Sequence, residues 1–203
     1  MLWGLPLWKV PLKRVHLTRM QHSGGRVGRA VHLHTGQLAV DEMAEVGGVV
    51  VTSPARTVVD LARTVSFESA VVTADAALHD GLVDAAGLAA AMARAAGSRG
   101  CPAARRVIAF ANGRSESVGE SRSRVALSRA GVPAPTPQWE VWCGRTLLGR
   151  CDFGWPERSA VGEFDGEVKY GRLLRPGQDP GKVVFEEKIR EDALRAQGLN
   201  VVR

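Results

Sequence analysis

The chain has 203 residues, 45% of them hydrophobic and 24% charged, which suffices for one large or two small domains with a buried core. No apolar run is long enough to cross a bilayer, which argues against an integral membrane protein. The net charge of +6 suits a polyanionic partner such as nucleic acid, although a GC-rich genome also produces arginine-rich chains without selection for DNA binding.

The first 51 residues predict short strands separated by glycine-rich turns, because apolar and polar residues alternate in RVHLTR, RAVHLH and GVVVTS. The piece VHLH places His32 and His34 on one face of a strand. Two histidines can begin a zinc site, but no third ligand follows at a recognisable spacing. We therefore interpret them as half-buried strand histidines.

Four helices are predicted between residues 53 and 112. Ser53 and Ser66 are expected to cap the first two, Asp84 opens the third, and CPAARRVIAFANG forms the fourth. Asp60, Asp75 and Asp84 are interpreted as helix caps and as residues of solvated faces.

The stretch GRSESVG predicts a domain boundary near residue 113. The pattern that follows predicts a helix, the three strands WEVW, TLLGRCDFGW and AVGEFDG, a helix from Asp179 or Pro180 to Gly198, and the strand LNVVR. The last strand is expected beside the earlier ones through a helical crossover. The fold class is therefore α/β, with an α+β N-terminal part.

Three cysteines, Cys101, Cys143 and Cys151, contain no C-x-x-C pair. We interpret them as small buried residues in a reducing cytoplasm.

Three carboxylates lie close together in the predicted strands near residue 150. Asp152 is expected to share a strand face with Leu148, while Glu163 and Asp165 share a face of the next strand. If the two strands pair, Asp152 and Glu163 approach each other and repel unless a cation lies between them. Oxygen ligands suit Mg²⁺ or Mn²⁺, and Lys169 can orient a water or neutralise developing charge.

An ordinary explanation of the same acids stays open. The dipeptide DG is a hairpin signal, and acids on an exposed strand face cost little. Glu120 lies in the first turn of its helix, where an acid favours the helix dipole. Spacing alone leaves a metal site and a solvated face as alternatives.

The order of motifs in the second half resembles the very-short-patch-repair-like branch of the PD-(D/E)XK nucleases. The motifs are GES, RCDFGW, GEFDG-x-x-K and R-x-D-x-L-x-x-x-G-x-x-V-x-R, and they cover roughly residues 113–203. The resemblance implies a restriction-endonuclease-like domain with a mixed sheet flanked by helices, and Mg²⁺- or Mn²⁺-dependent cleavage of DNA.

This resemblance also implies roles for individual residues. Asp152 would be the central metal ligand, Glu163 the second, and Glu120 the helix carboxylate near the metal. Asp165 and Lys169 complete the catalytic set, but Asp165 stands where the superfamily often has lysine and Lys169 where the branch usually has histidine. A lysine serves less readily than histidine as a neutral proton shuttle. The DNA contacts are expected from four arginines, Arg122, Arg124, Arg150 and Arg190.

The first half, residues 1–112, resembles actinobacterial proteins with an AbiEi-type antitoxin region, through VHLTR, VTSPARTVVDLAR and ADAAL. In such proteins a winged helix usually precedes this region, and the sequence begins after that place. The resemblance implies a type IV toxin–antitoxin context, with DNA and a nucleotidyltransferase-like toxin as partners. The main hypothesis is a metal-dependent endonuclease. The alternatives are a non-catalytic antitoxin or DNA-binding regulator, and a decayed fragment that does neither.

Overall fold

The structure is a computed structural model and describes residues 2–21, 24–164 and 180–203. The chain divides into two compact units, Met1–Gly113 (unit 1) and Arg114–Arg203 (unit 2). Each unit contains helices and a sheet, so the fold is mixed α/β. Within the described ranges, no helix combines the length and the apolar character that a membrane span needs.

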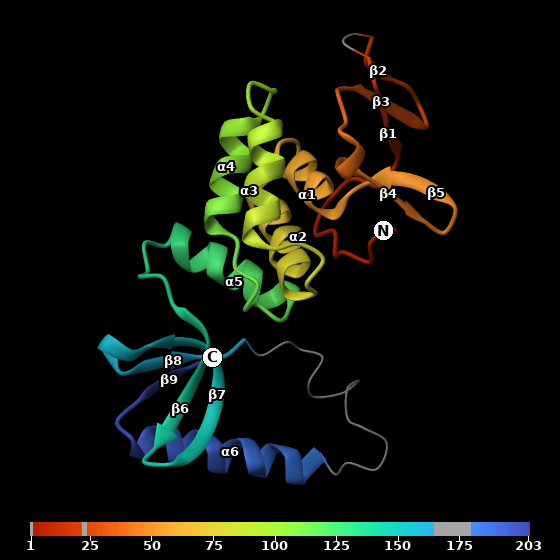
Figure 1. The fold of residues 1–203 in the computed structure, drawn as a ribbon. Coiled ribbons are helices and arrows are strands. Elements are labelled where there is room, and N and C mark those ends of the chain that lie inside the picture. Colours follow the sequence, from red (N-terminus) through yellow and green to blue (C-terminus); the bar gives the residue numbers. More distant parts are fainter. Residues whose placement is uncertain (1, 22–23, 165–179) are drawn as a thin grey trace. The chain divides into compact units, whose positions relative to one another are not determined.

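Unit 1 begins with a three-stranded sheet in the order β1-β3-β2, formed by β1 (Val15–Arg19), β2 (Arg26–Val27) and β3 (Val31–Thr35) (Figure 1). The strands β1 and β3 run parallel, and β2 is antiparallel to β3. The strands β4 (Met43–Val46) and β5 (Val49–Thr52) form a separate antiparallel hairpin. The sequence pattern indicated β1, β3 and β5 but not the short strands β2 and β4.

Four helices follow in unit 1: α1 (Pro54–Ala62), α2 (Phe67–His79), α3 (Ala85–Arg94) and α4 (Cys101–Phe110). The expected N-caps are confirmed, because the side chains of Ser53, Ser66 and Asp84 each accept the backbone N–H three residues later. These local hydrogen bonds fix where the first three helices begin.

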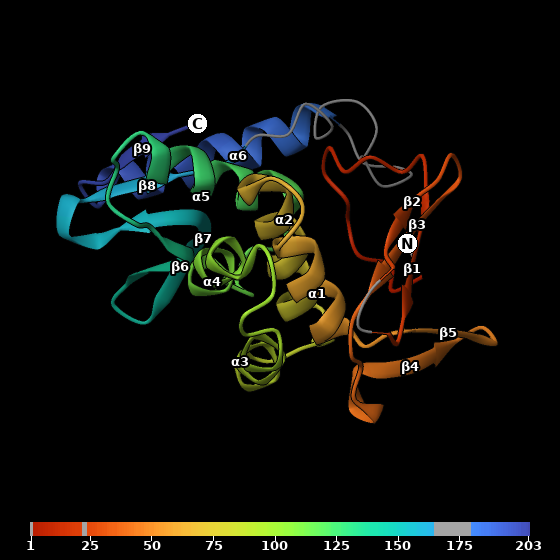
Figure 2. The same ribbon diagram turned by 90° about the horizontal axis from the view of Figure 1, so that it is seen from above.

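The helices pack against one another around the core of unit 1 (Figure 2). The largest fully buried apolar side chains of this core are Val58, Val59, Val71, Val72, Leu88 and Val107. Asp75 was wrongly expected on a solvated face: it is fully buried, and its Oδ1 accepts the N–H of Asn112 at 2.8 Å. A polar group at this depth is tolerated because it is hydrogen-bonded.

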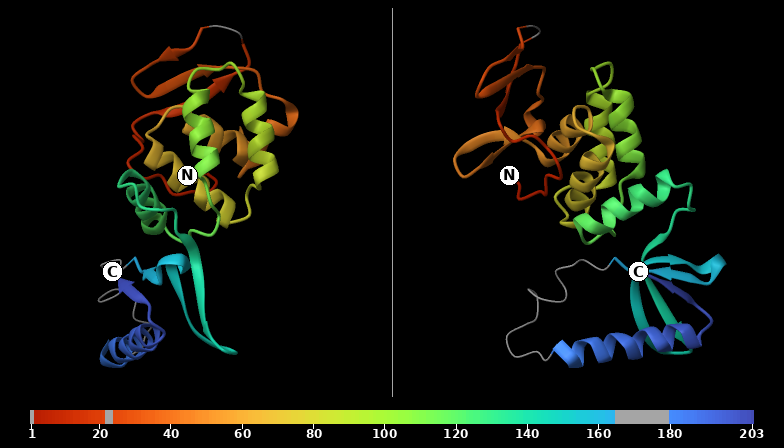
Figure 3. Two further views of the ribbon diagram at one scale, coloured as in Figure 1. Left: turned by 90° about the vertical axis from the view of Figure 1, so that its left-hand side faces the viewer. Right: turned by 180° about the vertical axis from the view of Figure 1, so that it is seen from behind.

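Unit 2 consists of α5 (Val118–Arg129), β6 (Thr136–Cys143), β7 (Thr146–Trp155), β8 (Ala160–Gly162), α6 (Pro180–Ala196) and β9 (Asn200–Val202). The four strands form one sheet in the order β6-β7-β8-β9, in which only the β8–β9 pair is parallel. The predicted order of elements and the neighbouring final strand are confirmed. The helix α6 lies along the sheet and contacts β7 and β9 (Figure 3).

The core of unit 2 joins the sheet to α6 through Val141, Cys151, Val161 and Leu194. Leu148 packs against this cluster, whereas the sequence placed it on the face of Asp152. The reason is a register shift: Gly149 pairs with Val141 and Leu147 with Trp142, which leaves Leu148 as an inserted residue. Such a bulge interrupts the alternation of faces on which the expectation rested.

Candidate functional site

Asp152 lies on β7, and Glu163 directly follows β8, the neighbouring strand, where the sequence placed a metal site. The antiparallel register of the two strands ends at the pair Phe153 and Gly162, the residues next to these two acids. Asp152 Oδ2 also accepts the N–H of Phe164 at 2.7 Å. The expected pairing of these two strands is therefore confirmed, and it places both acids beside the last paired residues of the register.

Glu163 is buried, 9% exposed, and lies among arginines. Its Oε1 forms an ion pair with Nη2 of Arg190, and its Oε2 lies 3.6 Å from Nη2 of Arg203. Arg203 is also 3.3 Å from a carboxylate oxygen of Glu191. The charge of Glu163 is thus compensated by cationic side chains of the protein itself, as a buried carboxylate requires.

Glu120 is also buried, and three donors of its own unit bind its carboxylate. Its oxygens accept the N–H of Glu116 at 3.0 Å, the hydroxyl of Ser117 at 2.8 Å and the amide of Gln138 at 2.8 Å. Ser117 Oγ in turn accepts the N–H of Glu120, which makes the pair a cap of α5. The solvated-face alternative is therefore wrong for Glu163, which is buried in a polar network. The expected position of Glu120 in the first turn of its helix is confirmed.

Cys151 lies beside these acids, at 0% exposure. Burial and the negative charges of Glu163 and Asp152 raise the pKa of its thiol to about 11, against the opposing effect of Arg190. The thiol therefore stays protonated at neutral pH, in keeping with a buried core residue.

The surroundings of these carboxylates do not fit a Mg²⁺ site. The oxygens of Glu120 and Asp152 that a metal would need already accept N–H groups, and Glu163 is paired with a guanidinium group. Within the described residues, Asp152, Glu163 and Glu120 do not form a group of three that could hold an ion. Asp165 and Lys169 lie outside the described residues. The catalytic and metal-binding roles of these five residues stay predictions.

The arginines expected to contact DNA in unit 2 form contacts within the protein. Arg124 is buried and lies 3.3 Å from the hydroxyl of Ser115, and Arg150 pairs with Glu116 at 2.9 Å. Arg190 binds Glu163, and Arg122 also has a partner. Their assignment to DNA stays a prediction, and a DNA contact by Arg150 or Arg190 would compete with an ion pair.

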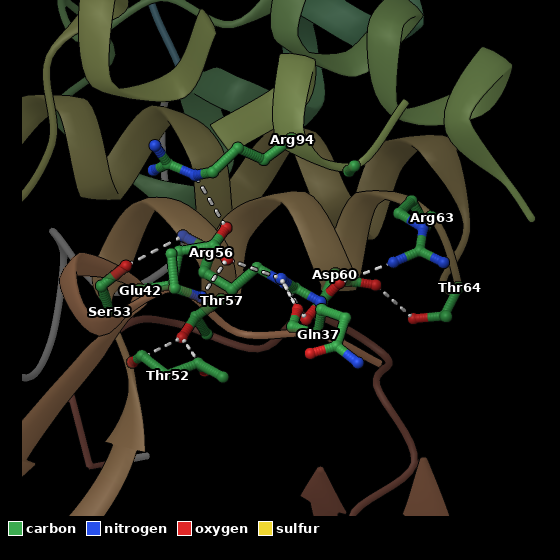
Figure 4. A network of polar contacts seen from close by, with 12 residues as sticks. Gln37, Glu42, Thr52, Ser53, Arg56, Thr57, Asp60, Arg63, Thr64 and Arg94 are labelled. Atoms are coloured by element: carbon green, nitrogen blue, oxygen red, sulfur yellow. Dashed lines mark hydrogen bonds and ion pairs between the residues drawn. The ribbon is translucent and has the colours of Figure 1, made fainter. Parts of the chain in front are cut away.

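Unit 1 contains a second polar network, which the motif TSPARTVVDLAR builds (Figure 4). Arg56 is 8% exposed; its Nη1 pairs with Glu42 at 3.1 Å and its Nε with Asp60 at 2.8 Å. Asp60 also pairs with Arg63 at 2.8 Å, and Arg94 from α3 lies 3.1 Å from Glu42. The network joins the segment before β4 to α1 and α3.

Electrostatics hold Glu42 in its charged form. Burial opposes its ionisation, but the N–H of Ala39 and the charges of Arg56 and Arg94 hold the pKa of Glu42 below its ordinary value. Burial likewise opposes the charge of Arg56, whereas Asp60 and Glu42 raise the pKa of Arg56. The conspicuous sequence motif is therefore explained by structure: it holds unit 1 together.

The N-terminal segment that contains the three-stranded sheet carries a charge imbalance that the overall composition conceals. Residues 1–40 contain six basic residues and no acidic one, which leaves 21 of each in residues 41–203. The six, all exposed, are Lys9, Lys13, Arg14, Arg19, Arg26 and Arg29. The contacts recorded for Arg14 and Arg19 are to the carbonyl oxygens of Gly28 and Gly24. Counting charge by segment would have found this surface from the sequence.

The same sheet brings three histidines together. Within the described residues, His16, His32 and His34 are the group of possible metal ligands whose coordinating atoms all lie within 4.8 Å of one another. The sequence indicated His32 and His34 but missed His16, because it comes from β1 and reaches the others only through the parallel pairing with β3.

Comparisons with known proteins point to one family. The family model described as AbiEi antitoxin C-terminal domain matches residues 7–110, about half of the chain. Two Mycobacterium tuberculosis proteins, Uncharacterized protein MT2308 of strain CDC 1551 / Oshkosh and Uncharacterized protein Rv2248 of strain ATCC 25618 / H37Rv, are each 34% identical over 139 residues. The aligned region is 68% of this chain and 50% of each relative, so the chain spans about half the length of these relatives. No solved structure matches the chain.

Proposed function

Because the chain belongs to the AbiEi antitoxin C-terminal domain family, we propose that it is a non-catalytic regulator in a toxin–antitoxin context and that it binds DNA through the three-stranded sheet of unit 1. The family match covers this sheet and the four helices α1 to α4 of unit 1. It does not extend to the carboxylates of unit 2.

The observation that carries the proposal is the composition of residues 1–40, where six exposed cations occur without one acid. Such a surface gains free energy on binding DNA by releasing condensed counterions, and the affinity then falls steeply with salt. If all six cations neutralised phosphates, the slope of log K against log salt would be about −5. Phosphate contacts of this kind position a protein on DNA and carry no sequence information by themselves.

Fluorescence anisotropy with a short labelled DNA duplex, over a series of salt concentrations, tests the proposal. Arg26→Gln/Arg29→Gln removes one charge from β2 and one from the connection between β2 and β3, and is expected to reduce the salt slope by about 2. Arg105→Gln/Arg106→Gln is the matched control, because both arginines are exposed on α4 and the change in net charge is the same. Equal losses of affinity in the two variants would reject the sheet as the binding surface.

A second candidate partner is the toxin, and exposed apolar residues on the same sheet favour it. Val15, Leu17 and Val31 are 61%, 50% and 38% exposed, and alternation places them on the face opposite the three histidines. Leu17→Asp is expected to abolish rescue of cells that express a neighbouring nucleotidyltransferase-like toxin gene, while DNA binding persists. Rescue by Leu17→Asp at the wild-type level would exclude this face as the toxin contact.

The endonuclease hypothesis stays a prediction that the same samples can address. Plasmid nicking in Mg²⁺ or Mn²⁺ that disappears in Asp152→Ala would replace the regulatory proposal with a catalytic one. On the regulatory proposal, DNA binding and rescue are expected to survive in Asp152→Ala, and the nicking rate is expected to be the same with and without the substitution.

A further inference from the structure

The three histidines of unit 1 occupy one face of a parallel strand pair. His16 lies directly opposite His32 in the register, and His34 follows two residues after His32, opposite Thr18. Residues two apart on a strand share a face, so all three rings project from the same side. Their ring centroids are 3.9 Å apart for His32 and His34 and 5.1 Å apart for each of the pairs that include His16.

The spacing of the ring nitrogens is close to that of a metal site. Nε2 of His34 and Nδ1 of His16 lie 3.0 Å apart, and the coordinating atoms of the three rings are all within 4.8 Å. Tetrahedral zinc, with Zn–N bonds of about 2.0–2.1 Å, holds its ligand nitrogens about 3.3–3.4 Å apart. The His16–His34 pair therefore needs to open by only a few tenths of an ångström, and the pairs that include His32, at most 4.8 Å apart, need to close by at most about 1.5 Å.

The chemistry of the cluster selects the class of metal. A ligating histidine must be neutral. Imidazole ligands without carboxylates suit zinc and related divalent transition metals rather than Mg²⁺ or Ca²⁺.

We propose that His16, His32 and His34 form a three-histidine zinc site that ties β1 to β3, with the fourth position taken by water or another small ligand. Within the described residues, no fourth side chain completes the group. Three protein ligands and one open position are typical of zinc sites that can accept an exogenous ligand. The proposal does not depend on DNA binding or on toxin binding.

Titration of metal-free full-length protein with Zn²⁺, in competition with a chromophoric chelator, tests the site. We expect one zinc per chain in the wild type and an affinity at least about tenfold lower in His16→Gln, His32→Gln and His34→Gln. His79→Gln is the matched control, because His79 lies on α2 and contacts only the carbonyl of Gly113 among the recorded contacts. Unchanged binding in His32→Gln, or an equal loss in His79→Gln, would overturn the assignment.

Spectroscopy supplies readouts that do not depend on how well a glutamine variant folds. Co²⁺ in the wild type is expected to give the visible d–d bands of a tetrahedral site, and His32→Cys is expected to add a thiolate-to-Co²⁺ charge-transfer band in the near ultraviolet. X-ray absorption of the zinc-loaded wild type should show three imidazole ligands at about 2.0 Å. Absence of zinc binding in the wild type, or a zinc shell without imidazole, would reject the proposal.

Discussion

Arg56 is the residue on which the polar network of unit 1 depends. It is buried and binds two carboxylates, Glu42 and Asp60, on different segments of the chain. Removing one partner of a buried ion pair costs more than the pair itself contributes, because the remaining charge stays in an apolar environment. The effect of a substitution here is therefore expected to be large although no ligand is involved.

Arg56→Ala is expected to lower the free energy of unfolding by about 3 kcal/mol, because it leaves Glu42 with Arg94 as its remaining cationic partner. Arg56→Ala/Glu42→Gln should cost less than the sum of Arg56→Ala and Glu42→Gln, since the double variant no longer leaves the charge of Glu42 without Arg56. Urea denaturation measures both, and Arg106→Ala, exposed on α4, serves as the control with an expected change within about 0.5 kcal/mol. Additive costs in the double variant would contradict a coupled pair.

The lowered pKa of Glu42 leads to a prediction of how the free energy of unfolding depends on pH. Its folded pKa is lowered, so the unfolded state binds the proton more readily. The stabilisation is fully present above the ordinary glutamate pKa of about 4.3 and is lost as the pH falls through the folded pKa. Denaturation from neutral pH down to about pH 3 should therefore show a steeper loss of stability in the wild type than in Glu42→Gln. Parallel curves would exclude Glu42 as a source of the acid sensitivity.

At the scale of the elements, α5 and the end of β8 are positioned by a glycine. A Cβ built on Gly119 would overlap the ring of Phe164, which follows Glu163 and donates its N–H to Asp152. The absence of a side chain at Gly119 thus allows α5 to approach Phe164, which follows the end of β8.

Gly119→Ala is expected to destabilise unit 2, by about 1–3 kcal/mol, because the methyl group overpacks against Phe164. The direction of the change in the free energy of unfolding is informative, because in an unobstructed helix the same substitution stabilises the protein by about 1 kcal/mol. In a Phe164→Ala background the obstruction is gone, so Gly119→Ala should be neutral or stabilising there. The cycle is measured by thermal melts of the wild type, the two single variants and the double variant. If Gly119→Ala destabilised the protein both with and without Phe164, the cause would not be the contact with Phe164.

At the scale of the whole molecule, the two units have separate cores and different charge patterns. Unit 1 contains all six cations of the acid-free segment and the whole of the family match, whereas unit 2 contains Glu120, Asp152 and Glu163. We therefore expect each unit to fold independently of the other, and DNA binding to belong to the unit that ends at residue 113.

A fragment of residues 1–113 is expected to unfold cooperatively and to bind DNA with the salt slope of the full chain. A fragment of residues 114–203 should bind more weakly, since its arginines contact its own side chains. Calorimetry and anisotropy on the two fragments test this separation. If the fragment of residues 114–203 bound DNA with the same salt slope as the full chain, the DNA-binding surface would lie in unit 2. The arginines that the sequence assigned to DNA would then again be the candidates.

Local features made much of the fold predictable. Helix caps at Ser53, Ser66 and Asp84 and the order of elements in the second half follow from hydrogen bonds and periodicities within a few residues. The proximity of Asp152 and Glu163 was also predictable, because a hairpin register follows from strand alternation once the pairing is assumed. The burial of Asp75 was not, since its partner Asn112 lies on a distant segment.

The sequence by itself determined the helices, most strands, the acid-free basic segment and the family of the first half. The tertiary structure alone decided which distant side chains meet: Arg190 and Arg203 at Glu163, Arg94 at Glu42, and His16 beside His32. The physical reason is that capping and periodicity act over one or two turns of chain, whereas ion pairs and parallel strand pairing join segments with no fixed separation in sequence.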